Sequence, residues 1–221
     1  MRILIVVATQ PEVEPLMQAL GMQKSDEADN LFMPRHTSVA NCSVLVTGAG
    51  MVPTAFALGR HLPHNVYNLV INLGIAGSFD RNIQLGEVVE ITKDTFAELG
   101  AEDDTRFINI EQLGLGASIF NPTSSLGHFT QKITLPKASS ITVNTVHGKE
   151  ETIAGVIDRV NPQLESMEGA AFFYACRELK VPCVQIRAVS NYVEKRNRDN
   201  WQIGLAVKNL NTFALDLIRE L

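Results

Sequence analysis

The sequence has few of the features that would place it outside the ordinary globular class. It contains only three cysteines, Cys42, Cys176 and Cys183, which are odd in number and lack metal-ligand spacing. They predict buried, reduced thiols in a cytoplasmic protein rather than a disulfide framework. No metal and no other cofactor is expected.

Long apolar runs and basic clusters are also missing. The first apolar run, residues 3–8, is far too short to span a membrane, and Glu12 and Glu14 follow it closely. Neither a membrane partner nor a signal peptide is therefore expected. The 24 acidic and 19 basic residues give a formal net charge of −5. Because phosphate contacts need clustered Lys and Arg, this balance argues against nucleic acid as a partner.

Two glycine-rich turns, at residues 47–50 (TGAG) and 74–78 (GIAGS), lack a complete nucleotide fingerprint. Neither has the G-x-G-x-x-G or the G-K-[ST] pattern, so a dinucleotide or ATP site has weak support. Each turn is predicted to end a strand and open a helix. Glycine there would let the backbone approach a ligand closely, although a tight turn without a ligand explains the pattern equally well.

The sequence contains apolar runs that alternate with segments in which apolar residues recur at the spacing of a helix. We expect strands at residues 3–8, 43–47, 66–73, 87–92, 140–146 and 184–189, and helices at 11–20, 52–62, 168–179 and 198–221. Nearly continuous apolar strands are typical of a sheet covered on both faces. The alternation predicts an α/β fold, a single domain over residues 1–221 built as a three-layer αβα sandwich. Residues 98–137 are less regular and predict an insertion.

Polar side chains follow several of these strands, where ligands bind in open α/β sheets. Glu12 lies four residues beyond the first strand, and Glu168, preceded by Met167, opens a helix of small residues. Ser190 and Asn191 end a buried strand. Each has a structural explanation as well, since Glu favours the first turn of a helix and Asn favours turns.

With these features in this order, the chain resembles the purine nucleoside phosphorylase and nucleosidase superfamily, especially its hydrolytic branch. That branch includes the methylthioadenosine/S-adenosylhomocysteine nucleosidases and the futalosine hydrolases. The resemblance covers nearly the whole chain and is weakest over residues 98–137. It implies a mixed, twisted central sheet, a small-molecule nucleoside as substrate, and a homo-oligomer, dimeric or higher.

The resemblance also implies roles for individual residues. Glu12 would activate the attacking water, and Met167 and Glu168 would hold the ribose. The second glycine turn would contribute Ile75, Ala76 and Gly77 to the substrate site, next to Ser190. Cleavage of an N-glycosidic bond passes through an oxocarbenium-like state, which one carboxylate can stabilise while another deprotonates water.

Two departures from the family pattern narrow the substrate. Asn191 stands where adenine-specific nucleosidases carry Asp, and its NH2 group matches the O6 acceptor of a 6-oxopurine. Ile75 stands where phosphorolytic relatives usually place a hydroxyl residue, and an apolar lining is a poor phosphate site. The two together favour hydrolysis of a 6-oxopurine nucleoside.

Residues 190–201 resemble the signature segment of the futalosine hydrolases, which release hypoxanthine and dehypoxanthinylfutalosine from futalosine in menaquinone biosynthesis. Arg196 or Arg198 would then bind the aryl carboxylate of futalosine beyond the ribose, and Trp201 would pack on its ring. The open alternatives are a methylthioadenosine/S-adenosylhomocysteine nucleosidase, an inosine/guanosine phosphorylase, and a catalytically silent nucleoside-binding protein.

Overall fold

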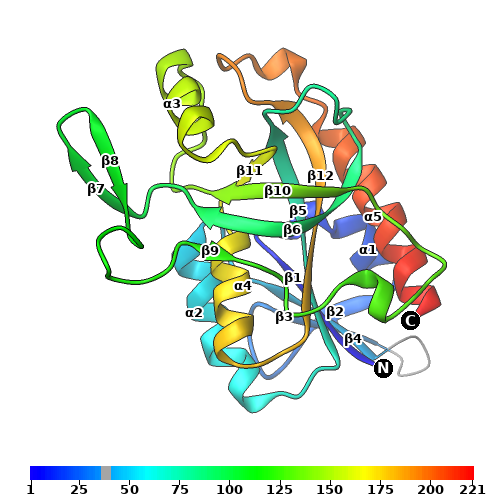
Figure 1. Ribbon diagram of the computed structural model, residues 1–221. Helices are drawn as coiled ribbons and strands as arrows, with labels where there is room; N and C mark the ends of the chain where they lie inside the picture. Colours follow the sequence, from blue (N-terminus) through cyan, green and yellow to red (C-terminus); the bar gives the residue numbers. More distant parts are fainter. Residues whose placement is uncertain (36–40) are drawn as a thin grey trace.

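The computed structural model describes residues 1–35 and 41–221 (Figure 1). Its strands are β1 Arg2–Val7, β2 Met22–Lys24, β3 Leu31–Pro34, β4 Asn41–Val46, β5 Leu69–Ser78, β6 Val88–Phe96, β7 Gly100–Asp103, β8 Arg106–Asn109, β9 Ile119–Phe120, β10 Lys137–Thr142, β11 Leu164–Ser166 and β12 Cys183–Tyr192. Its α-helices are α1 Glu14–Ala19, α2 Met51–His61, α3 Glu150–Val160, α4 Gly169–Glu178 and α5 Ile203–Glu220. Short 3-10 turns occur at Gln10–Glu12, Leu62–His64, Leu126–His128 and Arg198–Asn200.

The main sheet is mixed and has the strand order β11-β10-β6-β12-β5-β1-β4-β3-β2. β1 is parallel to both β4 and β5, and β12 is parallel to β5 but antiparallel to β6. This confirms the predicted α/β fold. One feature was not predicted: β11 also pairs with the end of β5, so this half of the sheet curls back on itself.

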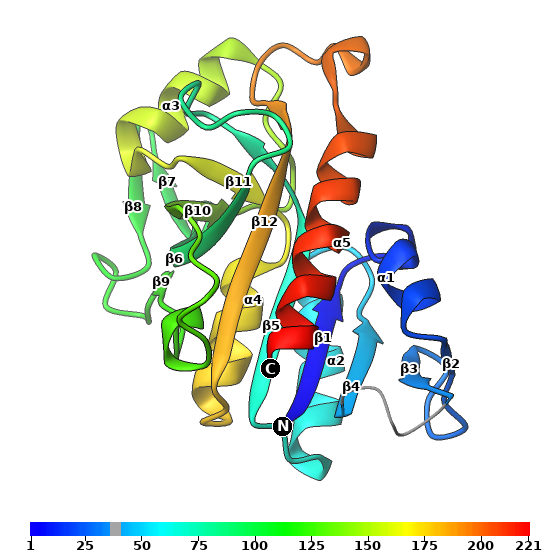
Figure 2. The same ribbon diagram turned by 90° about the vertical axis from the view of Figure 1, so that its right-hand side faces the viewer.

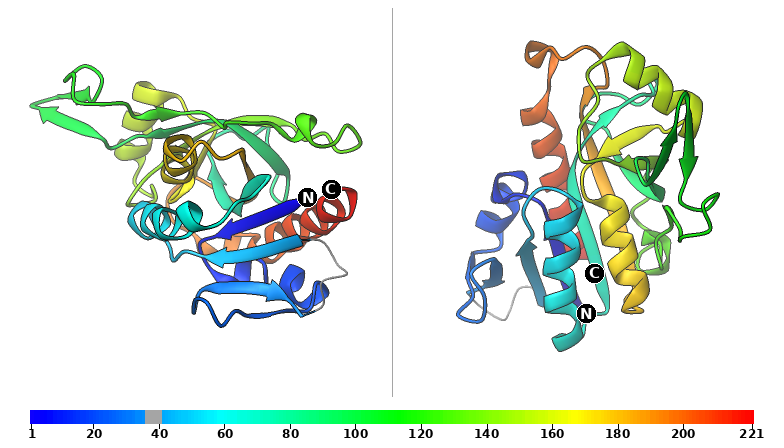
Figure 3. Two further views of the ribbon diagram at one scale, coloured as in Figure 1. Left: turned by 90° about the horizontal axis from the view of Figure 1, so that it is seen from below. Right: turned by 90° about the vertical axis from the view of Figure 1, so that its left-hand side faces the viewer.

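Helices cover both faces of the sheet. α1 and α5 pack on one face, and α2 and α4 lie side by side on the other (Figures 2 and 3). The apolar run of β1 serves both cores, because Leu4 and Val6 pack on the α2 and α4 side whereas Ile3 and Ile5 pack on the α5 side. Burial of each such side chain stabilises the fold by about 1.5–3 kcal/mol, which explains why the strand has no polar face.

Two predicted helices begin later than expected. Arg198–Asn200 is a 3-10 turn, and α5 starts only at Ile203. The Asn197 side chain accepts a hydrogen bond from the Asp199 amide at 3.1 Å, and Trp201 is extended, so the helix cannot start earlier. The helix predicted at 11–20 is likewise a 3-10 turn followed by α1, because Val13 leaves the helical region at φ −127°.

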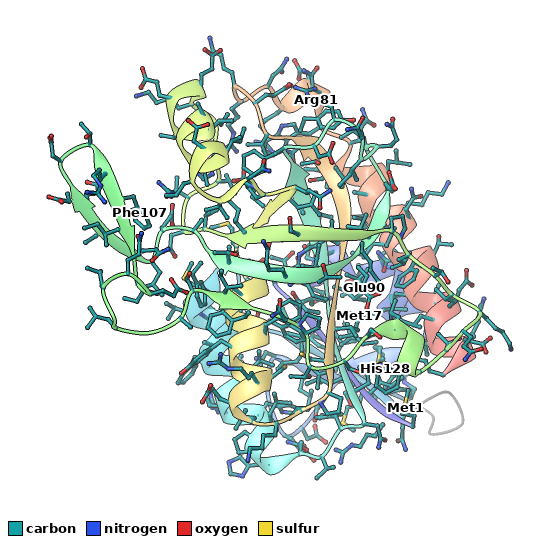
Figure 4. The ribbon with its side chains drawn as sticks, viewed as in Figure 1. Met1, Met17, Arg81, Glu90, Phe107 and His128 are labelled. Atoms are coloured by element: carbon teal, nitrogen blue, oxygen red, sulfur yellow. The ribbon has the colours of Figure 1, made fainter. Side chains whose placement is uncertain are left out.

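The second glycine turn was also predicted wrongly. Residues 74–77 do not end a strand and open a helix, because they continue β5 as far as Ser78. The strand expected at 140–146 ends at Thr142, and α3 was not predicted at all. Residues 98–137 contain the β7–β8 hairpin, which projects from the body and carries Phe107 (Figure 4).

Two further observations concern the surface. No helix in residues 1–35 and 41–221 is long and apolar enough to cross a membrane. On α2, Val52 and Phe56 are 73% and 65% exposed. Such residues suit a subunit interface, but the homo-oligomer remains a prediction.

Candidate active site

A cavity of about 580 Å³ opens where β1, β5 and β12 end and α4 begins. Residues that the sequence analysis selected and that line it are Glu12, Ile75, Ala76, Gly77, Met167, Glu168, Ser190, Asn191, Arg196 and Trp201. They come from segments far apart in the chain, which the parallel strands bring to one edge of the sheet. Arg198 is the one selected residue that does not line the cavity.

Glu12 is held firmly at one side of the cavity. Its Oε2 accepts hydrogen bonds from the Thr9 amide at 2.9 Å and the Thr9 hydroxyl at 2.8 Å, and its Oε1 accepts one from the Ile75 amide at 3.2 Å. Its carbonyl accepts a hydrogen bond from Asn211 of α5 at 2.8 Å. The carboxylate is therefore fixed in orientation while it still faces the cavity, as a base for a bound water requires.

Glu168 immediately precedes α4 and reaches across to the first glycine turn. Its Oε1 accepts a hydrogen bond from the Gly50 amide at 2.9 Å. Gly50 directly precedes α2 and has φ +99°, a conformation that favours glycine. The carboxylate thus sits at the positive end of a helix dipole, where a negative charge is stabilised. Among the described residues, no hydrogen-bond donor contacts its Oε2, and Glu168 lines the cavity.

Arg187 of β12 lies beneath the two carboxylates and was not predicted. It is 1% exposed, and its guanidinium donates hydrogen bonds to the Asn72 side chain and to the Ile186 carbonyl. A methyl group on Gly74 would lie 3.1 Å from Arg187 Nη1 and 3.3 Å from Glu12 Oε1, so glycine lets both groups approach the same point. Burial lowers the pKa of Arg187, and the negative charges of Glu168, Asp94 and Glu12 oppose that shift.

A third carboxylate, Asp94, is buried behind this arginine. It accepts hydrogen bonds from Thr142 at 2.8 Å and from Gln185 at 3.1 Å. Burial raises the pKa of Asp94 to about 6, although these hydrogen bonds and the charge of Arg187 act in the opposite direction. Since Gly169 at the start of α4 packs directly on Asp94, the buried network also supports the position of Glu168.

Asn191 lies at the other side of the cavity with its amide oriented. The Ser190 hydroxyl donates a hydrogen bond to Asn191 Oδ1 at 2.8 Å, and Asn191 Nδ2 donates one to the Tyr192 carbonyl at 3.1 Å. An amide has two N–H donors and two acceptor positions, so one of each remains for a ligand. This assignment of N and O follows from the hydrogen bonds.

The two predicted arginines differ in position. Arg196 lines the cavity and its guanidinium lies 5.1 Å from the centre of the Trp201 ring. Arg198 is exposed in its 3-10 turn, 5.8 Å from the same ring and outside the lining, so its predicted contact with substrate is not supported. Glu194 does not neutralise either one, since it pairs with Arg81, which lies at the upper end of the molecule (Figure 4).

Sequence reasoning missed three polar residues here: Arg187, His147 and Glu165. A signal existed for Arg187, because a cation within the apolar run 183–189 must be buried and needs a counter-charge. No local signal marked His147 or Glu165, which line the cavity as a close pair with 2.7 Å between His147 Nδ1 and Glu165 Oε2.

The arrangement combines two oriented carboxylates, a buried cation and an oriented amide around one cavity. The parts contributed by the glycine turns, Ala49 and Ile75 to Gly77, are uncharged. Such a site can hold a sugar by its hydroxyls, bind a heterocycle at the amide and activate a water between the carboxylates.

Comparison with known proteins places the chain in a family. A model of the phosphorylase superfamily matches residues 2–219. The futalosine hydrolase of Acidothermus cellulolyticus is 31% identical over 94% of this chain and 86% of that protein, and that of Thermus thermophilus is 29% identical over 80% of each. A 5'-methylthioadenosine/S-adenosylhomocysteine nucleosidase of Colwellia psychrerythraea is 28% identical over 98% of this chain and 95% of that protein.

Solved structures agree at the level of the fold. The crystal structure of a 5'-methylthioadenosine/S-adenosylhomocysteine nucleosidase from Colwellia psychrerythraea in complex with adenine has a TM-score of 0.83 at 24% identity. The match covers 100% of this chain and 96% of that one. The sequence motifs and the family model both indicate the phosphorylase superfamily. The chain therefore belongs to the phosphorylase superfamily, the group of enzymes that its motifs resemble.

Proposed function

We propose that this protein hydrolyses the N-glycosidic bond of a 6-oxopurine nucleoside, with futalosine as substrate and hypoxanthine and dehypoxanthinylfutalosine as products. The observation that carries the proposal is the cavity in which Glu12 and Glu168 face Asn191. Two relatives named futalosine hydrolase, at 29% and 31% identity, support the same substrate. The product would then serve menaquinone biosynthesis.

In this mechanism Glu12 takes a proton from water as the water attacks the anomeric carbon. Glu168 accepts hydrogen bonds from the ribose hydroxyls, and its negative charge stabilises the positive charge that grows on the sugar. Met167 packs beside the sugar. Asn191 donates to O6 of the base and accepts from N7 once N7 is protonated, and this proton comes from solvent because an amide cannot supply it.

Water is preferred over phosphate as the nucleophile for a physical reason. A phosphate dianion needs donors or cations, whereas the glycine turns place the apolar Ile75 and Ala76 at the cavity wall. A second candidate activity, cleavage of methylthioadenosine or S-adenosylhomocysteine, is favoured by the relative that is 28% identical over nearly the whole chain. Asn191 argues against it, because adenine presents a donor at position 6.

The direct test is incubation with futalosine, inosine and methylthioadenosine, each with and without phosphate, followed by analysis of the released base. We expect hypoxanthine from futalosine at a rate that phosphate does not change. Faster release of adenine from methylthioadenosine would favour the second candidate, and a requirement for phosphate would make the enzyme a phosphorylase.

The far end of the substrate gives a separate prediction for Arg196. A charge-assisted hydrogen bond to a carboxylate contributes about 1.5–3 kcal/mol. Arg196→Ala should therefore lower kcat/KM for futalosine by about tenfold to a hundredfold. Cleavage of inosine, which lacks the carboxylate, should barely change.

Arg198→Ala is the matched control, because Arg198 lies near the same tryptophan but outside the cavity. Arg198→Ala should lower kcat/KM for futalosine less than Arg196→Ala does. If Arg196→Ala lowers cleavage of futalosine and inosine equally, the arginine supports the fold or the purine end, and another group binds the carboxylate.

A further inference from the structure

Two polar side chains flank Gly77 on neighbouring strands. Asn191 of β12 and Glu165 of β11 are both in register with Gly77 of β5. A methyl group on Gly77 would lie 3.0 Å from Val193 Cγ2, 3.2 Å from Asn191 Nδ2 and 3.5 Å from Glu165 Cγ. The amide and the carboxylate therefore face the same side of the sheet, toward the cavity that both line. Because Gly77 has no side chain, Asn191, Glu165 and Val193 can all approach this point of the strand.

Glu165 is a buried carboxylate that the mechanism above does not use. Its side chain is 3% exposed, and it contacts His147 in two ways. The His147 amide donates to both carboxylate oxygens, at 3.1 and 3.3 Å, and the His147 ring approaches Glu165 Oε2 at 2.7 Å through Nδ1. Phe79 packs against the histidine ring, with 6.2 Å between ring centres. The carboxylate is thus fixed in place.

The contacts with His147 leave Glu165 at least one free position at which it can accept a hydrogen bond. A carboxylate offers about four acceptor positions, and the His147 amide and ring occupy up to three of them. Toward the cavity it can therefore accept a hydrogen bond from a ligand but cannot donate one. Beside it, Asn191 keeps one free N–H donor.

A 6-oxopurine is complementary to a donor on Asn191 beside an acceptor on Glu165. Its O6 acceptor is next to an N1–H donor, whereas adenine has an NH2 donor next to an N1 acceptor. With O6 at Asn191, N1–H falls on the side of Glu165. We propose that Glu165, held by His147, accepts the N1–H of the base and is a second determinant of specificity beside Asn191. The inference rests on the proposed function, which supplies the 6-oxopurine.

The test compares bases that differ only on this edge. Calorimetry would measure binding of hypoxanthine, 1-methylhypoxanthine and adenine to the wild-type enzyme and to Glu165→Gln, alongside turnover of inosine and adenosine. In the wild type, hypoxanthine should bind at least about tenfold more tightly than either other base, because a buried acceptor facing adenine N1 or a methyl group loses its partner. The wild-type comparison holds even if the variant folds poorly.

Glu165→Gln should reduce this discrimination by about tenfold to a hundredfold, since an amide can turn to donate to adenine N1. The inosine-to-adenosine ratio of kcat/KM should fall with it. Glu98→Gln is the matched control: Glu98 accepts the Asn144 amide at 2.9 Å near the same loop but lies outside the cavity lining. Its base preference should equal that of the wild type.

The outcomes separate the two proposals. If the wild type prefers adenine and adenosine, the proposed 6-oxopurine specificity fails and the role of Glu165 fails with it. If the wild type prefers hypoxanthine but Glu165→Gln weakens hypoxanthine and adenine equally, Glu165 merely supports the loop of His147. That result, or a wild type that binds 1-methylhypoxanthine as tightly as hypoxanthine, would overturn the inference alone.

Discussion

Glu12→Gln should lower turnover of the nucleoside by about a hundredfold to ten-thousandfold while substrate binding stays within about tenfold. A glutamine has nearly the same shape, and its carbonyl can still accept a hydrogen bond from Thr9. It cannot take a proton from water, so the loss falls on the transition state. Single-turnover rates and the affinity for an uncleaved nucleoside analogue would measure the two effects separately.

Glu14→Gln is a suitable control for this variant. Glu14 lies two residues further on, accepts hydrogen bonds from Gln10 and Gln18, and does not line the cavity. Turnover by the Glu14→Gln variant should match that of the wild type. Near-normal turnover in Glu12→Gln would remove Glu12 from the mechanism. Equal loss in both variants would mean that the turn carrying them has been disturbed.

Glu168→Gln should weaken both binding and rate, each by about tenfold to a hundredfold. Hydrogen bonds to a charged acceptor contribute about 1.5–3 kcal/mol, and the ribose hydroxyls would lose such an acceptor. The positive charge that forms on the sugar would also lose a stabilising negative charge. Inhibition by a ribose-bearing analogue and kcat would report the two effects.

A comparison of ribonucleosides with their 2′-deoxy counterparts makes this test specific. The penalty of Glu168→Gln should be smaller on a deoxynucleoside, because one of the hydroxyls that Glu168 would bind is already gone. Glu178→Gln, at the exposed end of the same helix, is the control. An unchanged affinity for ribose-bearing inhibitors would show that Glu168 does not hold the sugar.

The three carboxylates near Arg187 differ in how deeply they are buried. Asp94 is fully buried, and burial raises its pKa to about 6. Glu12 and Glu168 are half-buried and line the cavity. The buried cation Arg187 lies among all three carboxylates. Removal of Arg187 would leave the buried Asp94 without its cation, which is costly.

Much of the fold was predictable because local patterns determine it. Continuous apolar runs such as that of β1 are consistent only with a sheet covered on both faces, and β1 does pack against two cores. The positions of Glu12 and Asn191, just beyond or at the end of such strands, pointed to the same edge of the sheet. Helix starts were less predictable, as at Val13 and Trp201, because backbone angles there depend on local hydrogen bonds.

The sequence by itself determined the α/β fold, because alternating apolar and helical segments are local patterns. Its ordered motifs also indicated the family and the candidate site residues. The tertiary structure alone decided which distant groups meet. Arg187 is brought beneath Glu12 by the register of β12 on β5, and Arg196 rather than Arg198 faces the cavity. Glu165 lies beside Gly77 only because β11 turns back onto β5, a long-range pairing that no local pattern encodes.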